Sequence, residues 1–157
     1  KATSTLAQRL RLEPRPLRQR RTQETVSAVF ADTFFYLALL RKDDPARPCA
    51  MAESKINRRI ITTEFILLEL GNACAQVGDR EDFLSLLAGL RASPRVEIVP
   101  LNQQLLKRGL DLFAERKDKD WSLTDCISFE VMQDFDIHSA LTGDRHFQQA
   151  GFEALLL

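Results

Sequence analysis

The sequence of 157 residues has few cysteines, and they are poorly placed for pairing. Cys49, Cys74 and Cys126 are odd in number and far apart. This spacing argues against a disulfide framework and against a zinc site, and it favours a reducing compartment, so we expect a cytoplasmic protein. We expect all three side chains to be buried as small apolar groups.

Long apolar runs are also missing. The longest candidate, residues 34–40, is far shorter than the roughly 20 apolar residues that a membrane span needs. The first residues lack the pattern of a signal peptide, and we therefore expect no contact with a membrane. The hydrophobic fraction of 45% and the charged fraction of 28% are ordinary for a globular protein, and the length suffices for one domain with its own core.

Several catalytic motifs are absent from the sequence. A glycine-rich GK[ST] loop and a GxSxG elbow do not occur, which excludes a Walker-type NTPase and argues against a serine hydrolase. Phe34 stands two residues after Asp32, where an aspartyl-phosphate phosphatase needs a second aspartate. A receiver domain needs a lysine late in the chain, but the last lysine here is Lys119.

The net charge of zero conceals two regions of opposite charge. Residues 1–28 carry seven basic and two acidic residues, whereas the rest of the chain carries 15 basic and 20 acidic residues. Because Pro14 and Pro16 lie among the arginines, we interpret residues 1–25 as a flexible basic leader and residues 26–157 as the folded domain. The leader is either a fusion remnant or an arm that contacts RNA or a partner.

Short apolar strands alternate with longer helices throughout residues 26–157. We expect strands at residues 27–32, 59–62, 96–99, 137–141 and 152–156. We expect helices at residues 33–41, 46–57, 63–77, 79–92 and 101–117, a helix that begins at residue 122, and a short one after residue 144. This alternation predicts an α/β fold with a central, mainly parallel sheet and helices on both faces.

Two helix starts have clear capping signals. Thr63 is a good N-cap, and Ser122 with Asp125 three residues later predicts a capping box. The helix after Thr63 has an apolar side at helical spacing, which we expect to face the core. That side consists of Ile66, Leu70, Ala73 and Val77.

Four carboxylates are predicted to meet at one edge of the sheet. Asp32 ends the first strand, Asp125 opens a helix and Asp144 follows a later strand, so all three belong at the carboxyl edge, where open α/β sheets bind ligands. Glu69 interrupts an apolar helix near the end of the second strand. Each acid also has a structural explanation, since the aspartates are suited to helix caps worth about 1 kcal/mol and the glutamate to the surface.

Converging carboxylates repel one another unless a cation neutralises them. An all-oxygen ligand set suits Mg²⁺ or Mn²⁺ better than zinc. Such an ion lowers the pKa of a bound water, orients it and stabilises charge on a phosphate, so that phosphodiester hydrolysis needs no protein nucleophile.

Four segments of the sequence resemble the signature segments of PIN domains: AVFADTFFYLALL, TTEFILLELGNACA, DKDWSLTDCISFEVM and ALTGDRHFQQAGF. The resemblance covers about residues 27–157. It implies a three-layer α/β/α fold and a Mg²⁺/Mn²⁺-dependent ribonuclease. The matching catalytic and metal-binding positions are Asp32, Glu69, Asp125 and Asp144, with Thr33 and Thr142 in supporting roles.

The resemblance also implies partners. Many stand-alone bacterial PIN proteins are toxins of the VapC type, so we expect an RNA substrate, a cognate antitoxin and a homodimer, the last through helices 33–41 and 46–57. Because an acidic pocket repels RNA, basic residues should rim it. The candidates are Arg116, Lys117, Lys119 and Arg145.

The remaining candidates receive structural roles. We expect Trp121 to be a buried anchor at a helix start, His138 to begin a strand, and His146 to lie in a helix turn near Asp144, where it could touch a phosphate. An alternative to the ribonuclease is a non-catalytic PIN-like module that docks RNA or a partner and whose acids bind metal weakly or not at all. A flap nuclease would need helical insertions for which this chain has little room.

Overall fold

Five short strands form one sheet, in which neighbouring strands are all parallel and the order is β3-β2-β1-β4-β5. The computed structural model describes residues 27–157, so the predicted leader at residues 1–25 lies outside the described residues. The strands are β1 (Ala28–Ala31), β2 (Arg59–Thr63), β3 (Val96–Val99), β4 (Ser139–Leu141) and β5 (Glu153–Ala154). The predicted parallel sheet is confirmed.

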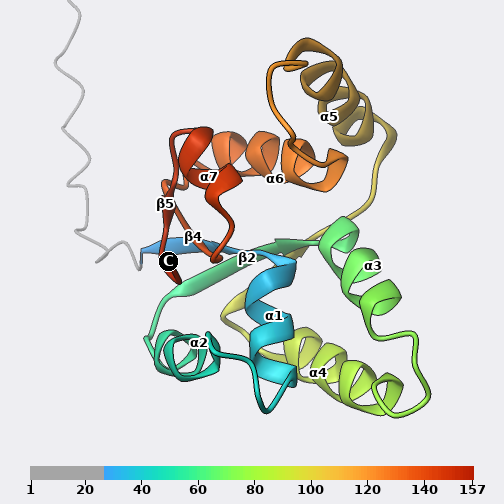
Figure 1. Ribbon diagram of the computed structural model, residues 1–157, viewed down its shortest axis with the longest axis vertical. Coiled ribbons are helices and arrows are strands. Elements are labelled where there is room, and N and C mark those ends of the chain that lie inside the picture. The colour runs from blue at the N-terminus through green and yellow to red at the C-terminus, as the bar shows by residue number, and fades with distance from the viewer. Residues whose placement is uncertain (1–26) are drawn as a thin grey trace, which may run out of the picture.

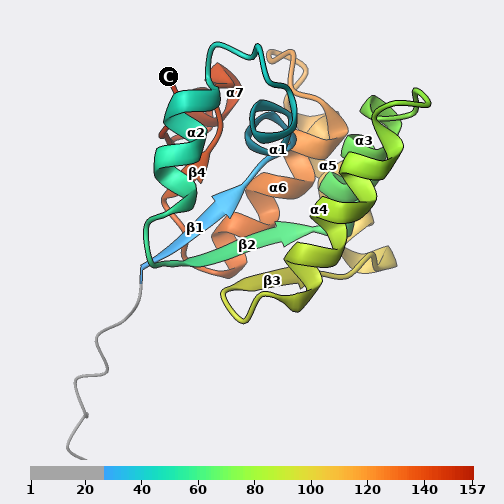
Figure 2. The same cartoon turned by 90° about the horizontal axis from the view of Figure 1, so that it is seen from below.

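Helices cover both faces of this sheet (Figures 1 and 2). One face carries α6 (Leu123–Asp134) and α7 (Arg145–Gln149), with α5 (Gln103–Glu115) packed outside α6. The opposite face carries α1 (Thr33–Leu40), α2 (Arg47–Ser54) and α4 (Arg80–Ala92), while α3 (Glu64–Ala73) continues from the end of β2. The three-layer architecture is therefore as predicted. None of the helices within residues 27–157 has the length and apolar character needed to cross a membrane.

Helix α6 lies between the sheet and α5 and is buried on most of its surface. Ile127, Phe129, Val131 and Met132 are all in the core, because this helix has no face left for solvent along its middle. Gly109 on α5 allows the close packing, since a Cβ at that position would lie 2.3 Å from the Cγ1 atom of Ile127. Asp125 therefore lies in the first turn of a helix that is fixed by packing on both sides.

The predicted end of α3 was wrong. Thr63 caps the helix as predicted, with its hydroxyl accepting from the N–H of Ile66 at 3.0 Å, but the helix ends at Ala73 and not at Gly78. Beyond the last turn the chain leaves the core, so that Val77 is 90% exposed. The buried side of this segment consists of Ile66, Leu67, Leu70 and Cys74.

The prediction for the cysteines was correct for Cys74 and Cys126, which are buried, and wrong for Cys49, which is exposed. Cys49 lies in the first turn of α2, a helix that buries only Ala50 fully. A helix with such a narrow buried side leaves its other apolar residues in solvent, so its sequence alone did not indicate which of them would be covered.

Candidate active site

The ends of β1 and β4 bring two of the predicted acids to the same edge of the sheet. Ala31 pairs with Leu141 in these neighbouring parallel strands, so Asp32 and the turn that carries Asp144 follow side by side. Asp125 lies in the first turn of α6, and Glu69 lies on α3. The structure thus places all four acids around the carboxyl edge, as the order of strands and helices predicted.

Asp32 is the most unusual of the four acids. It occupies the N-cap position of α1, yet its side chain makes no capping bond. The carboxylate is 6% exposed, and its Oδ2 atom accepts a hydrogen bond of 2.9 Å from the hydroxyl of Thr142. Burial raises its pKa to about 7, an effect that the bonds from Thr142 and Thr33 oppose and that the charges of Asp125 and Glu69 increase.

Glu69 is tied to the start of α1. The hydroxyl of Thr33 donates a hydrogen bond to its Oε2 atom, which links α3 to the residue next to Asp32. Glu69 is also close enough for its charge to raise the pKa of Asp32. This acid therefore belongs to the same cluster and is not a free surface side chain.

Asp125 forms the predicted capping box with Ser122. The hydroxyl of Ser122 accepts from the N–H of Asp125 at 3.0 Å, and the Oδ2 atom of Asp125 accepts from the N–H of Ser122 at 2.8 Å. The capping bond uses only one of the two carboxylate oxygens. Asp125 can therefore stabilise its helix and still present an oxygen to a ligand.

Asp144 caps α7 through its Oδ1 atom, which accepts from the N–H of His146 at 2.8 Å. The hydroxyl of Thr142 accepts from the N–H of Asp144 at 3.0 Å while it donates to Asp32, so one buried side chain connects the two acids. Gly143, between Thr142 and Asp144 in the chain, packs against the ring of Phe34. A Cβ atom added to Gly143 would lie 2.5 Å from that ring. The turn is thus held from both sides.

Three of the side chains at this edge could hold a metal ion together. Ligand atoms of Asp125, Asp144 and His146 all lie within 4.8 Å of one another. The Nδ1 atom of His146 is 3.0 Å from Oδ2 of Asp125 and 3.5 Å from Oδ2 of Asp144. Asp32 and Glu69 lie beside this group and are not part of it. His146 was not among the predicted site residues; the available signal was its position two residues after Asp144 in a strand-to-helix turn.

The four basic residues predicted to rim the site differ in whether an acidic side chain already pairs with them. Arg116 forms two hydrogen bonds with Asp118, of 2.8 and 3.0 Å, and its guanidinium lies over the ring of Trp121 at 4.6 Å. Lys119 is 3.9 Å from the same Asp118, whereas Lys117 and Arg145 are exposed. Trp121 is buried as predicted.

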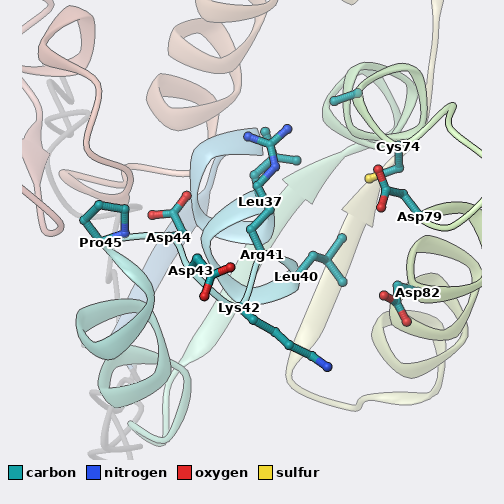
Figure 3. A pocket seen from close by; sticks show the side chains of 11 residues that line it. Leu37, Leu40, Arg41, Lys42, Asp43, Asp44, Pro45, Cys74, Asp79 and Asp82 are labelled. Carbon is teal, nitrogen blue, oxygen red and sulfur yellow. The ribbon is translucent and has the colours of Figure 1, made fainter.

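A cavity of about 610 Å³ lies away from these acids, at the opposite end of α1 (Figure 3). Leu40 and Arg41 line it from the end of α1, and Cys74, Asp79 and Asp82 line it from the region between α3 and α4. The eight residues of α1 span about 12 Å between Asp32 and this cavity. The cavity is therefore separate from the acidic cluster.

Comparison with protein families identifies the domain. The family model "PIN domain" matches residues 29–153. The chain belongs to the PIN domain family. A search of curated proteins by sequence finds no match for this PIN domain.

Solved structures agree with this assignment. VapC20 of Mycobacterium tuberculosis, a toxin that cleaves the sarcin-ricin loop, is similar with a TM-score of 0.71 and 22% identity, over 79% of this chain and 95% of that chain. VapBC2 from Rickettsia felis, bound to a DNA fragment from its promoter, has a TM-score of 0.59 and 15% identity, over 81% and 96%. FitAcB from Neisseria gonorrhoeae has a TM-score of 0.57 and 18% identity, over 80% and 94%. At these identities the likeness shows the fold alone.

The donor set of this PIN domain fits a divalent cation. Within residues 27–157, neither lysine nor arginine forms an ion pair with Asp32, Glu69, Asp125 or Asp144. The cluster consequently concentrates negative charge, which adds to the larger effect of burial in raising the pKa of Asp32. Carboxylate oxygens are the ligands that Mg²⁺ and Mn²⁺ prefer.

Proposed function

We propose that this PIN domain is a hydrolase, a Mg²⁺- or Mn²⁺-dependent endoribonuclease, and the toxin of a toxin–antitoxin pair. The observation that carries the proposal is the burial of Asp32 among Glu69, Asp125 and Asp144, acids that no lysine or arginine within residues 27–157 pairs with. Mutual repulsion between crowded carboxylates is unfavourable unless a cation binds there. The family membership supports the same function.

Each acid has a proposed role. Asp32, Asp125 and Asp144 hold the ion, and Glu69 completes the ligand set or positions the attacking water. Thr33 orients Glu69, and Thr142 orients Asp32. When bound, a divalent ion supplies a more acidic water and positive charge beside the phosphate. No serine, cysteine or histidine nucleophile is required.

The mechanism predicts the chemistry of the product ends. Water attacks the phosphorus opposite the 3′-oxygen, the bond to that oxygen breaks, and the two products carry a 5′-phosphate and a 3′-hydroxyl. A 2′,3′-cyclic phosphate would instead show attack by the neighbouring 2′-hydroxyl, and it would contradict the proposed mechanism.

Cleavage of single-stranded RNA tests the proposal. We expect cutting with Mg²⁺ or Mn²⁺, none with EDTA, and none with Asp144→Asn. Asp111→Asn is a matched control, because Asp111 is exposed on α5 and pairs with Lys107. If no RNA is cut and calorimetry detects no metal binding, the non-catalytic module becomes the better interpretation.

The toxin proposal is supported by the fold shared with the toxin VapC20 and with VapBC2 and FitAcB. We expect expression of the chain in bacteria to stop growth and Asp144→Asn to relieve the arrest. A co-expressed antitoxin should do the same by covering the acidic edge. A homodimer is likewise a prediction, which sedimentation of the purified chain tests.

A further inference from the structure

His146 points its Nδ1 atom at two of the four acids. It lies 3.0 Å from Asp125 and 3.5 Å from Asp144, in the one group of possible metal ligands found within the described residues. We propose that His146 is a nitrogen ligand of the ion and that it shifts the preference of the site from Mg²⁺ towards transition ions such as Mn²⁺ and Co²⁺. This inference rests on the proposed function of the acidic site.

The spacing of the three ligand atoms fits one ion. Two ligands at right angles, each about 2.1 Å from a small divalent ion, lie about 3.0 Å apart. The distances from Nδ1 of His146 to the two carboxylates are close to this value. The atom that hydrogen-bonds to Asp125 thus also faces Asp144, so an ion held between the two carboxylates would lie within reach of Nδ1.

The chain holds His146 in place from two directions. Its own N–H donates to Oδ1 of Asp144, so the backbone that carries the imidazole is bonded to one of the proposed ligands. The next residue, Phe147, is fully buried and packs on the rings of Phe30 and Phe129, at centroid distances of 6.2 and 5.0 Å. The imidazole is therefore presented on a fixed support, while 28% of its surface stays accessible from solvent.

Ligand chemistry gives His146 a specific effect. Carboxylate and water ligands suit Mg²⁺, whereas imidazole nitrogen suits transition ions and binds Mg²⁺ poorly. A cluster built only from Asp32, Glu69, Asp125 and Asp144 would lack this bias. The inference therefore concerns which ion the site selects, a property that the acids alone do not determine.

The second histidine of the chain provides a matched control. His138 lies 3.4 Å from Asp136, so it too is beside an aspartate, but its side chain is 83% exposed and the pair is on the open surface. Removing His138 should leave metal binding unchanged.

The experiment measures binding of Co²⁺ and of Mg²⁺ by calorimetry to the full chain and to its His146→Asn and His138→Asn variants. The amide nitrogen of asparagine can take the place of Nδ1 as a donor to Asp125, so His146→Asn keeps a positioning role and removes the imidazole. We expect His146→Asn to weaken Co²⁺ binding by at least about 10-fold and Mg²⁺ binding by less than about 3-fold. Pulsed EPR of bound Mn²⁺ should show coupling to an imidazole nitrogen in the unaltered chain and not in His146→Asn.

Three results would overturn the inference. Unchanged Co²⁺ binding in His146→Asn, or absence of nitrogen coupling in the unaltered chain, would show that the imidazole is no ligand. Equal weakening of Co²⁺ and Mg²⁺ binding would show that the change acts through the carboxylates and not through loss of a nitrogen ligand. If the unaltered chain binds neither ion, the proposed function itself fails, and that result is distinct from the other three. Thermal unfolding of each variant without metal checks that the fold is intact.

Discussion

The acids of the site fall into two kinds that share one edge of the sheet. Asp125 and Asp144 each accept a backbone N–H at the start of a helix, so they stabilise the fold whether or not an ion is present. Asp32 stands in an equivalent N-cap position and caps nothing, although it is as deeply buried as Asp125 and more deeply than Asp144. Capping thus accounts for two of the acids structurally, whereas the burial of Asp32 is offset only in part, by its hydrogen bond from Thr142.

This difference has an energetic meaning. A carboxylate that bonds backbone N–H groups contributes to the free energy of unfolding, whereas a carboxylate buried beside other acids lowers it. Residues that destabilise a fold are characteristic of functional sites. The comparison predicts that changes at the two kinds of acid will have opposite effects on stability.

The largest effect is expected for Asp32→Asn. Loss of a direct ligand should reduce RNA cleavage by more than about 100-fold, beyond the range for residues that only support a ligand. The same change should raise the metal-free unfolding free energy at pH 8, on the order of 1–4 kcal/mol, because asparagine accepts the Thr142 bond without a buried charge. Cleavage assays and urea unfolding in EDTA measure the two effects. A less stable variant would contradict the comparison.

Asp125→Ala should lower both activity and stability. It removes a proposed ligand together with half of the capping box, and the lost cap should cost about 1 kcal/mol. Gly109→Ala serves as the control, because crowding Ile127 should destabilise the α5–α6 packing by about 1–3 kcal/mol without touching the site. Both variants should be less stable than the unaltered chain. If Gly109→Ala still cleaves RNA and Asp125→Ala does not, the loss of activity in Asp125→Ala is not caused by reduced stability.

The stability of the metal-free chain should depend on pH through Asp32. Its pKa is 3.8 in the unfolded chain and about 7 in the fold, so its contribution is fully present below pH 3.8 and is lost as the pH rises to 7. The loss amounts to roughly 1.4 kcal/mol for each unit of difference in pKa. Urea midpoints between pH 4 and 8 should show a fall that Asp32→Asn lacks. If the urea midpoints of the unaltered chain and of Asp32→Asn change with pH in the same way, Asp32 is not the group responsible.

The smallest effects are expected for substitutions of the basic residues that are predicted to rim the site and bind RNA. Arg145 is exposed, so Arg145→Ala should weaken RNA binding a few-fold and reduce the slope of its salt dependence by about 1. Arg116 is already paired with Asp118, so Arg116→Ala should change the slope less. Fluorescence anisotropy with an uncleavable RNA, at several salt concentrations, measures both. A larger change of slope in Arg116→Ala than in Arg145→Ala would mean that the Arg116–Asp118 ion pair opens when RNA binds.

Local signals in the sequence predicted the fold well where one residue determines a boundary. Thr63 and the Ser122–Asp125 box start their helices as predicted, because an N-cap is a contact within four residues. The end of α3 had no comparable signal, so tertiary packing decided that the chain leaves the core before Val77. The exposure of Cys49 likewise depends on which side of α2 other elements cover.

The site shows the same division. The order of strands predicted that Asp32 and Asp144 share an edge, since this follows from topology. The contact of His146 with Asp125 and Asp144 could not be predicted, because it depends on the rotation of one side chain in a turn held by buried Phe147. The sequence thus indicated which acids meet and did not indicate that the imidazole of His146 contacts two of them.

The buried hydroxyl of Thr142 determines where a proton can sit. The N–H of Asp144 can only donate, so it occupies a lone pair of this oxygen and leaves the single hydroxyl hydrogen for Asp32. While this bond is present, Oδ2 of Asp32 is an acceptor, and a hydrogen on the neutral acid is accommodated on Oδ1. One threonine thus gives the two oxygens of a symmetric carboxyl group different identities before any ligand arrives.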